Sequence, residues 1–414
     1  MYDVAIIGAG AAGIACAQSA LRKSLKAVVF DQSPDTFGGT CLNRGCIPAK
    51  FFIQKSKTHR SWKEVLTQSR EIVKKIKNPL LSYFETQGVQ FVWARPRLIS
   101  KHEIQVDNHR FDARNIIIST GSKPQRIIDH PRAMVAEEIL LKPDIPDNIL
   151  IIGGGYIGIE FASMLNSYGK NVTVFEKEEN ILGGYEPSLV NRLKLILEKK
   201  GIVIETAKGV WDEDLDNFDL TLLATGRCPS IENLGLEELG IELNEAGWIK
   251  TDSNMRTNIN NIYACGDISG KKFLAYTAEY QAHLCVHNIA GKEESEDYSE
   301  VPECVFSTPS IAKVGVSKEE AGQKNIEHRV LRSNFLKFSS SYVYDDEEGF
   351  IEIVLGEDDK ILGAATISGA AGELINAFTL CIKNNLTLND LKKCLFIHPT
   401  LSEIIPLLSR SSSE

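Results

Sequence analysis

Residues 4–31, VAIIGAGAAGIACAQSALRKSLKAVVFD, decide the fold of this chain. An apolar run is followed by three glycines in the pattern GxGxxG, an alanine-rich segment, a second apolar run and an acidic residue. This order predicts a strand, a tight turn, a helix and a second strand, with a pyrophosphate approaching the backbone at the helix N-terminus. We therefore expect a βαβ unit that binds a dinucleotide.

The same pattern recurs 145 residues later, in residues 149–176, ILIIGGGYIGIEFASMLNSYGKNVTVFE. In both copies the first glycine precedes the acid by 23 residues. A lone GxGxxG is weak evidence, but two copies in the same context predict two Rossmann-like dinucleotide-binding domains. The residues expected to serve the dinucleotides are Gly8, Gly10, Gly13 and Asp31 in the first copy, and Gly153, Gly155, Gly158 and Glu176 in the second.

The chain is longer than one hydrophobic core usually supports, and its pattern changes along its length. Each glycine unit closes on a further apolar strand, at residues 116–118 and 220–223, followed by Thr and Gly. From Val301 alternating segments at 350–355 and 361–367 precede helical segments at 372–383 and 388–392. This last part predicts strands with helices packed on one face.

The charge balance excludes proteins that act by neutralising phosphates. The 414 residues hold 46 Lys and Arg against 55 Asp and Glu, a formal net charge of −9, so we expect neither nucleic acid nor anionic lipid as a partner. We identify no leader peptide and no apolar segment long enough to span a bilayer. Nine mostly isolated cysteines are typical of free thiols in a reducing compartment, which predicts a cytoplasmic location.

Residues 38–50, GGTCLNRGCIPAK, distinguish a redox enzyme from a generic nucleotide-binding protein. Cys41 and Cys46 closely follow the first dinucleotide unit and are candidates for a disulfide bond. On an ideal helix the two thiols would not face one another, so the backbone must distort to join them. Two other interpretations stay open: a zinc site, although no further close Cys or Cys/His pair completes four ligands, and two unpaired structural thiols.

The cysteine segment resembles the redox-active disulfide motif of the pyridine nucleotide-disulfide oxidoreductases, and the resemblance covers essentially the whole chain in the same order. It implies an α/β fold with two Rossmann-like domains, for FAD and for NAD, and a C-terminal α+β dimerisation domain. Within the family the chain is most similar to the dihydrolipoyl dehydrogenases. The implied boundaries are residues 1–145 and 246–300 for FAD, 146–245 for NAD, and 301–414 for dimerisation.

The resemblance also implies roles for single residues. Cys41 is the thiol that is exposed to the substrate and exchanges with it, and Cys46 is the thiol beside the flavin. Lys50 lies next to the flavin with Glu160 tempering its charge, against the alternative of an exposed lysine and a helix-surface glutamate. Further contacts implied for FAD are Gly39, Thr40, Thr120, Gly121 and Asp267, and those for the nicotinamide nucleotide are Gly226 and Arg227.

A histidine near the C-terminus completes the implied site. Alone, His398 is more often a surface histidine than a catalyst. With Glu403 five residues later it resembles the family's His-Pro-Thr segment, in which the imidazole is the acid and base, the glutamate orients it, and the histidine comes from the partner subunit. The resemblance therefore implies a homodimer.

The acid of the second glycine unit indicates the nucleotide. Glu176 would accept hydrogen bonds from a ribose 2′-hydroxyl and repel a 2′-phosphate, and the next residues include no arginine cluster, which favours NAD over NADP. We expect electrons to pass between a dithiol, dihydrolipoamide free or on a lipoyl domain, and NAD through the cysteine pair and FAD. A 2-oxoacid dehydrogenase complex is an expected partner, and no metal cofactor is expected.

Two alternatives stay open. One is an NAD(P)H-dependent reductase of another disulfide, a metal or a quinone. The other is a non-catalytic flavoprotein that serves as a binding or assembly subunit.

Overall fold

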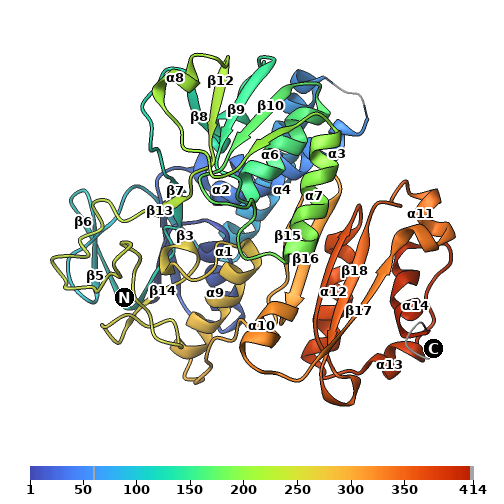
Figure 1. Ribbon diagram of the computed structural model, residues 1–414. Helices are drawn as coiled ribbons and strands as arrows, with labels where there is room; N and C mark the ends of the chain where they lie inside the picture. The colour runs from blue at the N-terminus through green and yellow to red at the C-terminus, as the bar shows by residue number, and fades with distance from the viewer. Residues whose placement is uncertain (59–60, 411–414) are drawn as a thin grey trace. The chain divides into compact units, whose positions relative to one another are not determined.

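The computed structural model describes residues 1–58 and 61–410, except for the side chains of residues 212–213 and 409–410 (Figure 1). Within it the chain divides into two compact units. The first unit comprises Met1–Asp129, Val135–Ile145 and Thr225–Glu296, and the second comprises His130–Met134, Pro146–Ala224 and the described residues from Asp297 onwards.

The main sheet of the first unit has the strand order β3-β2-β1-β6-β5-β4, with β14 paired to β6. β1 pairs in parallel with both β2 and β6, as expected for a βαβ unit. A separate antiparallel pair joins β7 to β13. The strands are β1 (Tyr2–Ile7), β2 (Ala27–Asp31), β3 (Gln90–Trp93), β4 (Arg97–Leu98), β5 (Glu103–Val106), β6 (His109–Ile118), β7 (Ser122–Pro124), β13 (Arg227–Pro229) and β14 (Ile262–Ala264).

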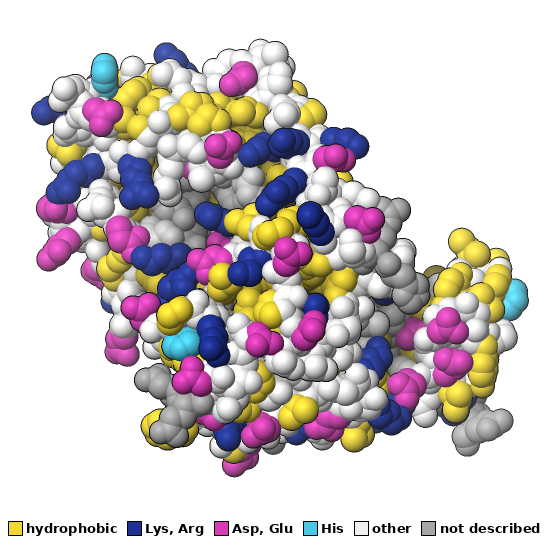
Figure 2. All heavy atoms as spheres, turned by 90° about the horizontal axis from the view of Figure 1, so that it is seen from above, with side chains coloured by type: hydrophobic (Ala, Val, Ile, Leu, Met, Phe, Trp, Pro, Cys, Tyr) yellow, Lys and Arg dark blue, Asp and Glu magenta, His cyan; other side chains and the backbone are white. Residues whose placement is uncertain are grey.

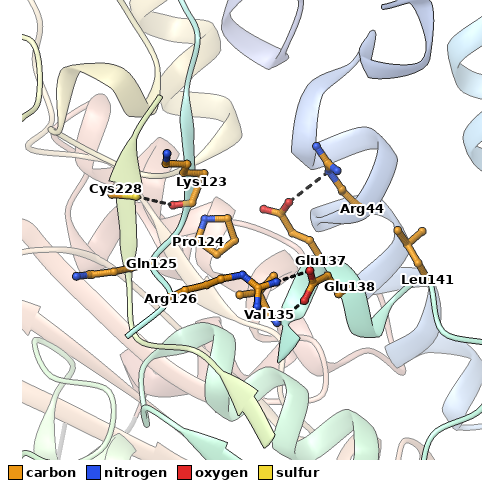
Figure 3. Close-up of a pocket in the computed structure, with 10 residues that line it drawn as sticks. All are labelled: Arg44, Lys123, Pro124, Gln125, Arg126, Val135, Glu137, Glu138, Leu141 and Cys228. Atoms are coloured by element: carbon orange, nitrogen blue, oxygen red, sulfur yellow. Dashed lines mark hydrogen bonds and ion pairs between the residues drawn. The ribbon is translucent and has the colours of Figure 1, made fainter. Parts of the chain in front are cut away.

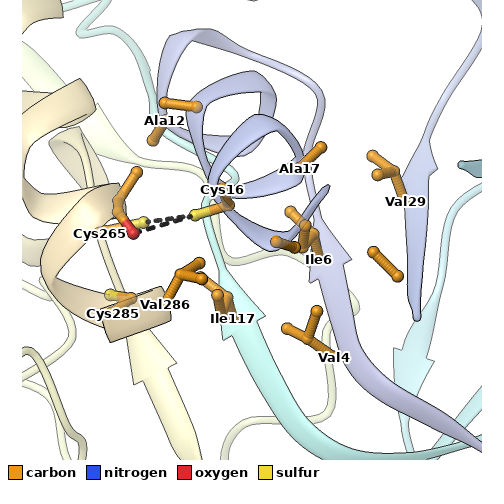
Figure 4. Close-up of a cluster of buried hydrophobic side chains, with 14 of the residues drawn as sticks. Val4, Ile6, Ala12, Cys16, Ala17, Val29, Ile117, Cys265, Cys285 and Val286 are labelled. Carbon is orange, nitrogen blue, oxygen red and sulfur yellow. Dashed lines mark hydrogen bonds between the residues drawn. The ribbon is translucent and has the colours of Figure 1, made fainter. Parts of the chain in front are cut away.

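Helices α1 and α9 pack on one face of this sheet around small and branched side chains (Figure 4). The core there includes the thiols of Cys16 and Cys265, whose sulfurs are 3.7 Å apart. The alanine-rich sequence of α1 suits this close packing, because alanine has a high helix propensity and occupies little space. The helices are α1 (Ala11–Arg22), α2 (Gly39–Arg44), α3 (Cys46–Ser56), α4 (Trp62–Thr86), α5 (Ala136–Ile139) and α9 (Ala275–Ile289).

The second unit contains two sheets. The order β11-β10-β9-β12-β8 repeats the parallel core of the first unit, with β9 between β10 and β12. The order β15-β16-β19-β18-β17 is antiparallel, with α12 packed against β16 and β19. The strands are β8 (Ala133–Val135), β9 (Asn148–Ile152), β10 (Asn171–Phe175), β11 (Val203–Glu205), β12 (Leu220–Leu223), β15 (Glu303–Val305), β16 (Ser310–Gly315), β17 (Arg329–Asn334), β18 (Phe350–Leu355) and β19 (Ile361–Ser368).

The two helices expected at 372–383 and 388–392 are present in the second unit as α12 and α13. The helices are α6 (Tyr156–Ser167), α7 (Pro187–Lys199), α8 (Asp212–Leu215), α10 (Lys318–Gln323), α11 (Ser339–Val343), α12 (Ala371–Lys383), α13 (Leu388–Lys392) and α14 (Ile404–Arg410).

The expected fold class is therefore confirmed: two parallel α/β sheets built on the glycine repeats, and an α+β part at the C-terminus. The exact domain boundaries stay predictions, and residues 225–245, expected in the NAD-binding domain, belong to the first unit by their contacts. Among the described residues no helix has the length and apolar character needed to cross a bilayer. Figure 2 shows basic and acidic side chains interspersed over the same face.

Candidate active site

The two glycine turns have the same geometry. The backbone N–H of Gly8 donates to Phe30 O, and that of Gly153 to Phe175 O, both at 2.8 Å. A Cβ at Gly13 would lie 1.8 Å from Gly8 O, and a Cβ at Gly158 would lie 1.8 Å from Gly153 O. The third glycine of each repeat thus lets its helix lie directly on the preceding strand.

Both helices that follow these turns begin at an uncapped glycine. Gly10 is the N-cap of α1 and Gly155 is the N-cap of α6, and neither helix has a side-chain cap or an acidic residue in its first turn. A Cβ at Gly155 would meet no atom within 4 Å, so the space beside it is open. Free N–H groups at a helix N-terminus attract a phosphate.

The acid of each repeat binds the backbone of its own turn. Asp31 Oδ2 accepts from Ala9 N and Glu176 Oε2 accepts from Gly154 N, both at 2.6 Å. Glu176 Oε1 also accepts from Glu178 N at 2.9 Å. Because a carboxylate has about four acceptor positions, each acid stabilises its turn and retains capacity for a ribose hydroxyl.

The cysteine segment lies against the first glycine turn. Gly38 N donates to Ala9 O at 2.8 Å, and a Cβ at Gly39 would come within 2.7 Å of the Gly10 Cα. Gly39, with φ near +61°, is the first residue of α2, and Thr40 follows it. Two positions expected to serve FAD from the cysteine motif are therefore next to those expected from the glycine motif.

The expected backbone distortion lies between the two cysteines. Helix α2 carries Cys41 and ends at Arg44, and α3 begins at Cys46. Between them, a Cβ at Gly45 would lie 2.8 Å from Thr40 O, so only glycine permits this close approach. The break turns the two thiols toward one another, and a hydrogen bond joins them.

In this structure the two thiols are joined by a hydrogen bond rather than by a disulfide. The hydrogen bond with Cys46, followed by burial, raises the pKa of the Cys41 thiol well above its usual value, while the charge of Lys50 acts in the opposite direction. Cys41 is half-buried and Cys46 is exposed. This order of exposure in the single chain is opposite to the expectation that Cys41 is the exposed thiol, because Cys46 begins a new helix at the surface of the unit.

The ends of β6 and β14 supply further polar groups. Thr120 follows β6, and its hydroxyl is buried without a hydrogen-bond partner among the described residues. Gly121 has φ near +69°. Asp267 follows β14, and burial raises its pKa, while a hydrogen bond from Ser122 and the charge of Arg227 lower it. An unpartnered buried hydroxyl at this sheet edge fits the polar part of a bound dinucleotide.

Arg227 lies in the first unit, among the residues expected to serve FAD. Its Nε donates to Ser122 Oγ at 2.6 Å and lies 3.8 Å from Asp267 Oδ2. Its Nη2 lies 3.3 Å from Glu137 Oε1. Gly226, with φ near +102°, precedes it. The structure thus places Arg227 beside Asp267, and its assignment to the nicotinamide nucleotide stays a prediction.

Glu160 is buried in the second unit, on α6. Its side chain is 7% exposed, and Oε1 accepts from Phe306 N at 2.9 Å. The alternative of a helix-surface glutamate is therefore wrong. Lys50 lies on α3 of the first unit and is partly buried. Their pairing beside the flavin stays a prediction.

The C-terminal pair is formed as expected. His398 Nδ1 lies 2.8 Å from Glu403 Oε1, and 69% of the histidine side chain is exposed. Although burial raises it, hydrogen bonds from Thr400 N and His398 lower the pKa of Glu403 overall. The carboxylate holds Nδ1, which leaves Nε2 of the exposed ring to exchange a proton.

Sequence reasoning missed Ser122 and Glu137. Ser122 directly follows the expected Thr120 and Gly121, so its position could have indicated it. Glu137 belongs to no sequence motif, and only its contacts in the folded chain indicate that it belongs to the site. Among the described residues no cluster of three or more His, Cys, Asp or Glu is arranged to bind a metal ion.

Two dinucleotide turns and a thiol pair against the first of them define a flavin- and nicotinamide-dependent disulfide oxidoreductase. Comparisons with known proteins agree: the model of the pyridine nucleotide-disulphide oxidoreductases matches residues 2–282, and that of their dimerisation domain matches residues 301–408. The chain therefore belongs to this family. FAD and NAD(H), the cofactors of the family, are its cofactors.

Individual relatives cover nearly the whole chain. Dihydrolipoyl dehydrogenase of Chlamydia trachomatis is 32% identical over 97% of this chain and 95% of the relative. Leghemoglobin reductase of Glycine max is 29% identical over 97% and 86%. Among solved structures, the HOCl-induced flavoprotein disulfide reductase RclA from Escherichia coli has a TM-score of 0.92 at 25% identity, over 99% of both chains.

Proposed function

We propose that this protein is a dihydrolipoyl dehydrogenase that transfers two electrons from a dihydrolipoyl substrate to NAD. The observation that carries the proposal is the approach of the Cys41–Cys46 segment to the first glycine turn, through Gly39 and Gly10. This contact puts a pair of interacting thiols next to the residues that suit FAD. The relatives named dihydrolipoyl dehydrogenase support the choice of substrate.

Different residues of this chain carry out the proton transfer and the thiol exchange. His398 Nε2 removes a proton from one substrate thiol, since Nδ1 is held by Glu403. The substrate thiolate attacks Cys41 Sγ of the oxidised pair, and Cys46 leaves as a thiolate. The second substrate thiol attacks the mixed disulfide and releases the oxidised substrate and the Cys41 thiolate, which takes up a proton.

The raised pKa of Cys41 keeps this thiol protonated once the pair is reduced. The thiolate that the exchange produces is the one on Cys46, which left the disulfide. Gly8, Gly10, Gly13, Asp31, Thr120 and Asp267 would hold FAD, which when bound carries the two electrons onward to NAD.

Glu176 supports NAD as the nucleotide. Both of its oxygens accept backbone hydrogen bonds, so the carboxylate is fixed at the end of β10. A fixed negative charge there accepts a ribose hydroxyl and repels a 2′-phosphate. The following Lys177 pairs with Glu178, which leaves it poorly placed to attract that phosphate.

Exposed apolar side chains on the C-terminal part support a homodimer. Large apolar side chains left in water are typical of an interaction surface. These side chains are Leu336, Tyr342, Val343, Tyr344, Leu380, Leu395 and Ile397. Membership of a 2-oxoacid dehydrogenase complex and a cytoplasmic location stay predictions.

Turnover of the purified holoenzyme tests the proposal. We expect NAD reduction by dihydrolipoamide, and NADH oxidation by lipoamide at least about tenfold faster than by glutathione disulfide, Hg(II) or quinones. Cu(II) belongs in the same panel as a second candidate acceptor, because the RclA neighbours include a Cu(II) complex. NADPH should replace NADH poorly.

A matched variant tests the thiol chemistry separately. Cys46→Ser should keep its flavin and lose both the turnover and the long-wavelength thiolate-to-flavin band seen on two-electron reduction of the wild type. Cys394→Ser, which changes an exposed thiol remote in sequence, should keep both. A flavin-loaded wild type that turns over no disulfide would overturn the proposal.

A further inference from the structure

Glu137 lies between the guanidinium groups of Arg44 and Arg227 within the first unit, and Figure 3 shows the contact with Arg44. Glu137 Oε2 is 3.3 Å from Arg44 Nε, and its Oε1 is 3.3 Å from Arg227 Nη2. Only 13% of the Glu137 side chain and 11% of the Arg227 side chain are exposed, whereas 48% of Arg44 is. Glu137 and Arg44 also line a cavity of about 590 Å³.

Each of the two arginines belongs to a different part of the proposed site. Arg44 is the last residue of α2, directly before the Gly45 break between the redox cysteines. Arg227 donates twice to Ser122, from Nε to Oγ and from Nη2 to the backbone oxygen at 2.9 Å, and pairs with Asp267. Arg44, Glu137, Arg227 and Asp267 thus form a chain of alternating charges.

The helix that carries Glu137 is held firmly. Trp62 Nε1 on α4 donates to Lys142 O at 2.8 Å, and Arg70 Nη2 donates to Leu141 O at 3.3 Å. Ile139, in the same helix, is fully buried. Because the residues that directly follow α5 are bonded to α4 and Ile139 is buried, Glu137 has a fixed position, and the more exposed Arg44 is held to it by the ion pair.

Loss of the Glu137 charge would affect the two arginines differently. Arg227 keeps Ser122 and Asp267 and is too buried to leave. Arg44 is half exposed and has no other ion pair among those identified in the described residues, so its guanidinium would turn to water. The end of α2 would then lose the ion pair that holds it, directly before the break at Gly45.

We propose that Glu137 is a positioning residue, which fixes the loop between Cys41 and Cys46 to the Arg227–Asp267 pair and so sets the position of the Cys46 thiolate. This inference rests on the proposed redox role of the two cysteines. It extends that role to a residue outside every motif of the family resemblance.

The test compares Glu137→Gln with Glu138→Gln. Glu138 is the next residue of α5 and pairs with Arg126, where both side chains are about half exposed, so it is a matched control. In the two-electron-reduced holoenzyme we expect Glu137→Gln to lower the thiolate-to-flavin absorbance per bound flavin about twofold or more. Alkylation of Cys46 by iodoacetamide, followed by mass spectrometry, should become about threefold faster. Glu138→Gln should match the wild type in both.

A second variant keeps the test decisive if Glu137→Gln folds poorly or loses flavin. Arg44→Gln changes a half-exposed side chain and should produce the same two effects, and the double variant should show no further loss, because both changes break one contact. Wild-type absorbance and alkylation rates in both single variants would overturn the inference. A wild type that lacks the band would instead contradict the proposed function.

Discussion

Glu186 and Glu319 of the second unit form a pair of interacting carboxyl groups. Glu186 is 6% exposed, precedes α7, and accepts from Lys318 N at 3.1 Å. Burial, followed by a hydrogen bond with Glu319, raises the pKa of Glu186 to about 7. The pKa of Glu319 is lowered instead: burial raises it, but the hydrogen bond with Glu186 and the charge of Lys318 outweigh that effect. Oε2 of each carboxyl is buried and has no other donor among the described residues.

This pair predicts that stability falls as pH rises between about 4.5 and 7. The folded state holds a proton on Glu186 that the unfolded chain has lost, so each pH unit costs up to about 1.4 kcal/mol. Glu186→Gln should flatten this dependence and leave the protein at least as stable as the wild type at pH 7.5. Urea unfolding midpoints at pH 5 and 7.5 measure the effect.

Glu179→Gln is the control for this prediction. Glu179 is exposed in the same loop, so its variant should keep the wild-type dependence on pH. An equal fall in stability for Glu186→Gln and the wild type would show that Glu186 does not hold this proton.

At the scale of elements, α1 and α6 share one structure that suits the binding of a diphosphate: a glycine turn followed by an uncapped helix N-terminus. The two repeats have equivalent hydrogen bonds in the strand, the glycine turn and the helix N-terminus. In each repeat the residue after the closing strand also bonds to the end of the first strand. Ser119 N donates to Ile7 O and Ala224 N donates to Ile152 O, both at 2.8 Å. The same substitution in each turn should therefore disrupt the turn in the same way, but each should abolish the binding of a different cofactor.

Alanine at the third glycine should separate the two cofactors. Gly13→Ala places a Cβ 1.8 Å from Gly8 O, which α1 can relieve only by moving off β1, at a cost of about 3 kcal/mol, and this variant should purify without flavin. Gly158→Ala should keep its flavin and lose NADH binding, measured by titration of the flavin-containing protein.

Gly155→Ala provides the comparison. Its Cβ meets no atom within 4 Å, so α6 should stay packed and the unfolding midpoint should not change, while NADH binding weakens because the Cβ occupies the approach of the pyrophosphate. Flavin loss in Gly158→Ala would contradict the division of cofactors between the repeats.

At the scale of the whole molecule, the reacting groups belong to different units of the chain. Cys41 and Cys46 lie in the first unit, and His398 lies in the second. The family's dimerisation-domain model covers residues 301–408 and therefore includes His398. A histidine that acts on the partner's cysteines would make the dimer the smallest active form.

Mixed dimers test this arrangement. His398→Ala and Cys46→Ser should each be inactive alone, but a mixed dimer contains one complete site, with the cysteines of one chain and the histidine of the other. After random assembly about half of the dimers are mixed, so about a quarter of the wild-type activity should return. Activity that stays absent in verified mixed dimers would place His398 at the cysteines of its own chain.

Both dinucleotide units and the break in the cysteine segment were predictable from the order of residues. Each depends on neighbours within about 30 positions, and glycine spacing, apolar runs and a terminal acid are local signals. The same holds for α12 and α13. The contact of His398 with Glu403 spans five residues and is local as well.

Three features are determined only by the tertiary structure: the partners of Arg227, the contacts of Glu137 and the burial of Glu160. Glu137 meets residues 93 positions before it and 90 positions after it, through an arrangement of strands that no spacing encodes. A charged side chain in a sequence is compatible with water or with many ion partners. Which of them it meets depends on how distant segments pack, because burial and pairing are properties of the assembled core.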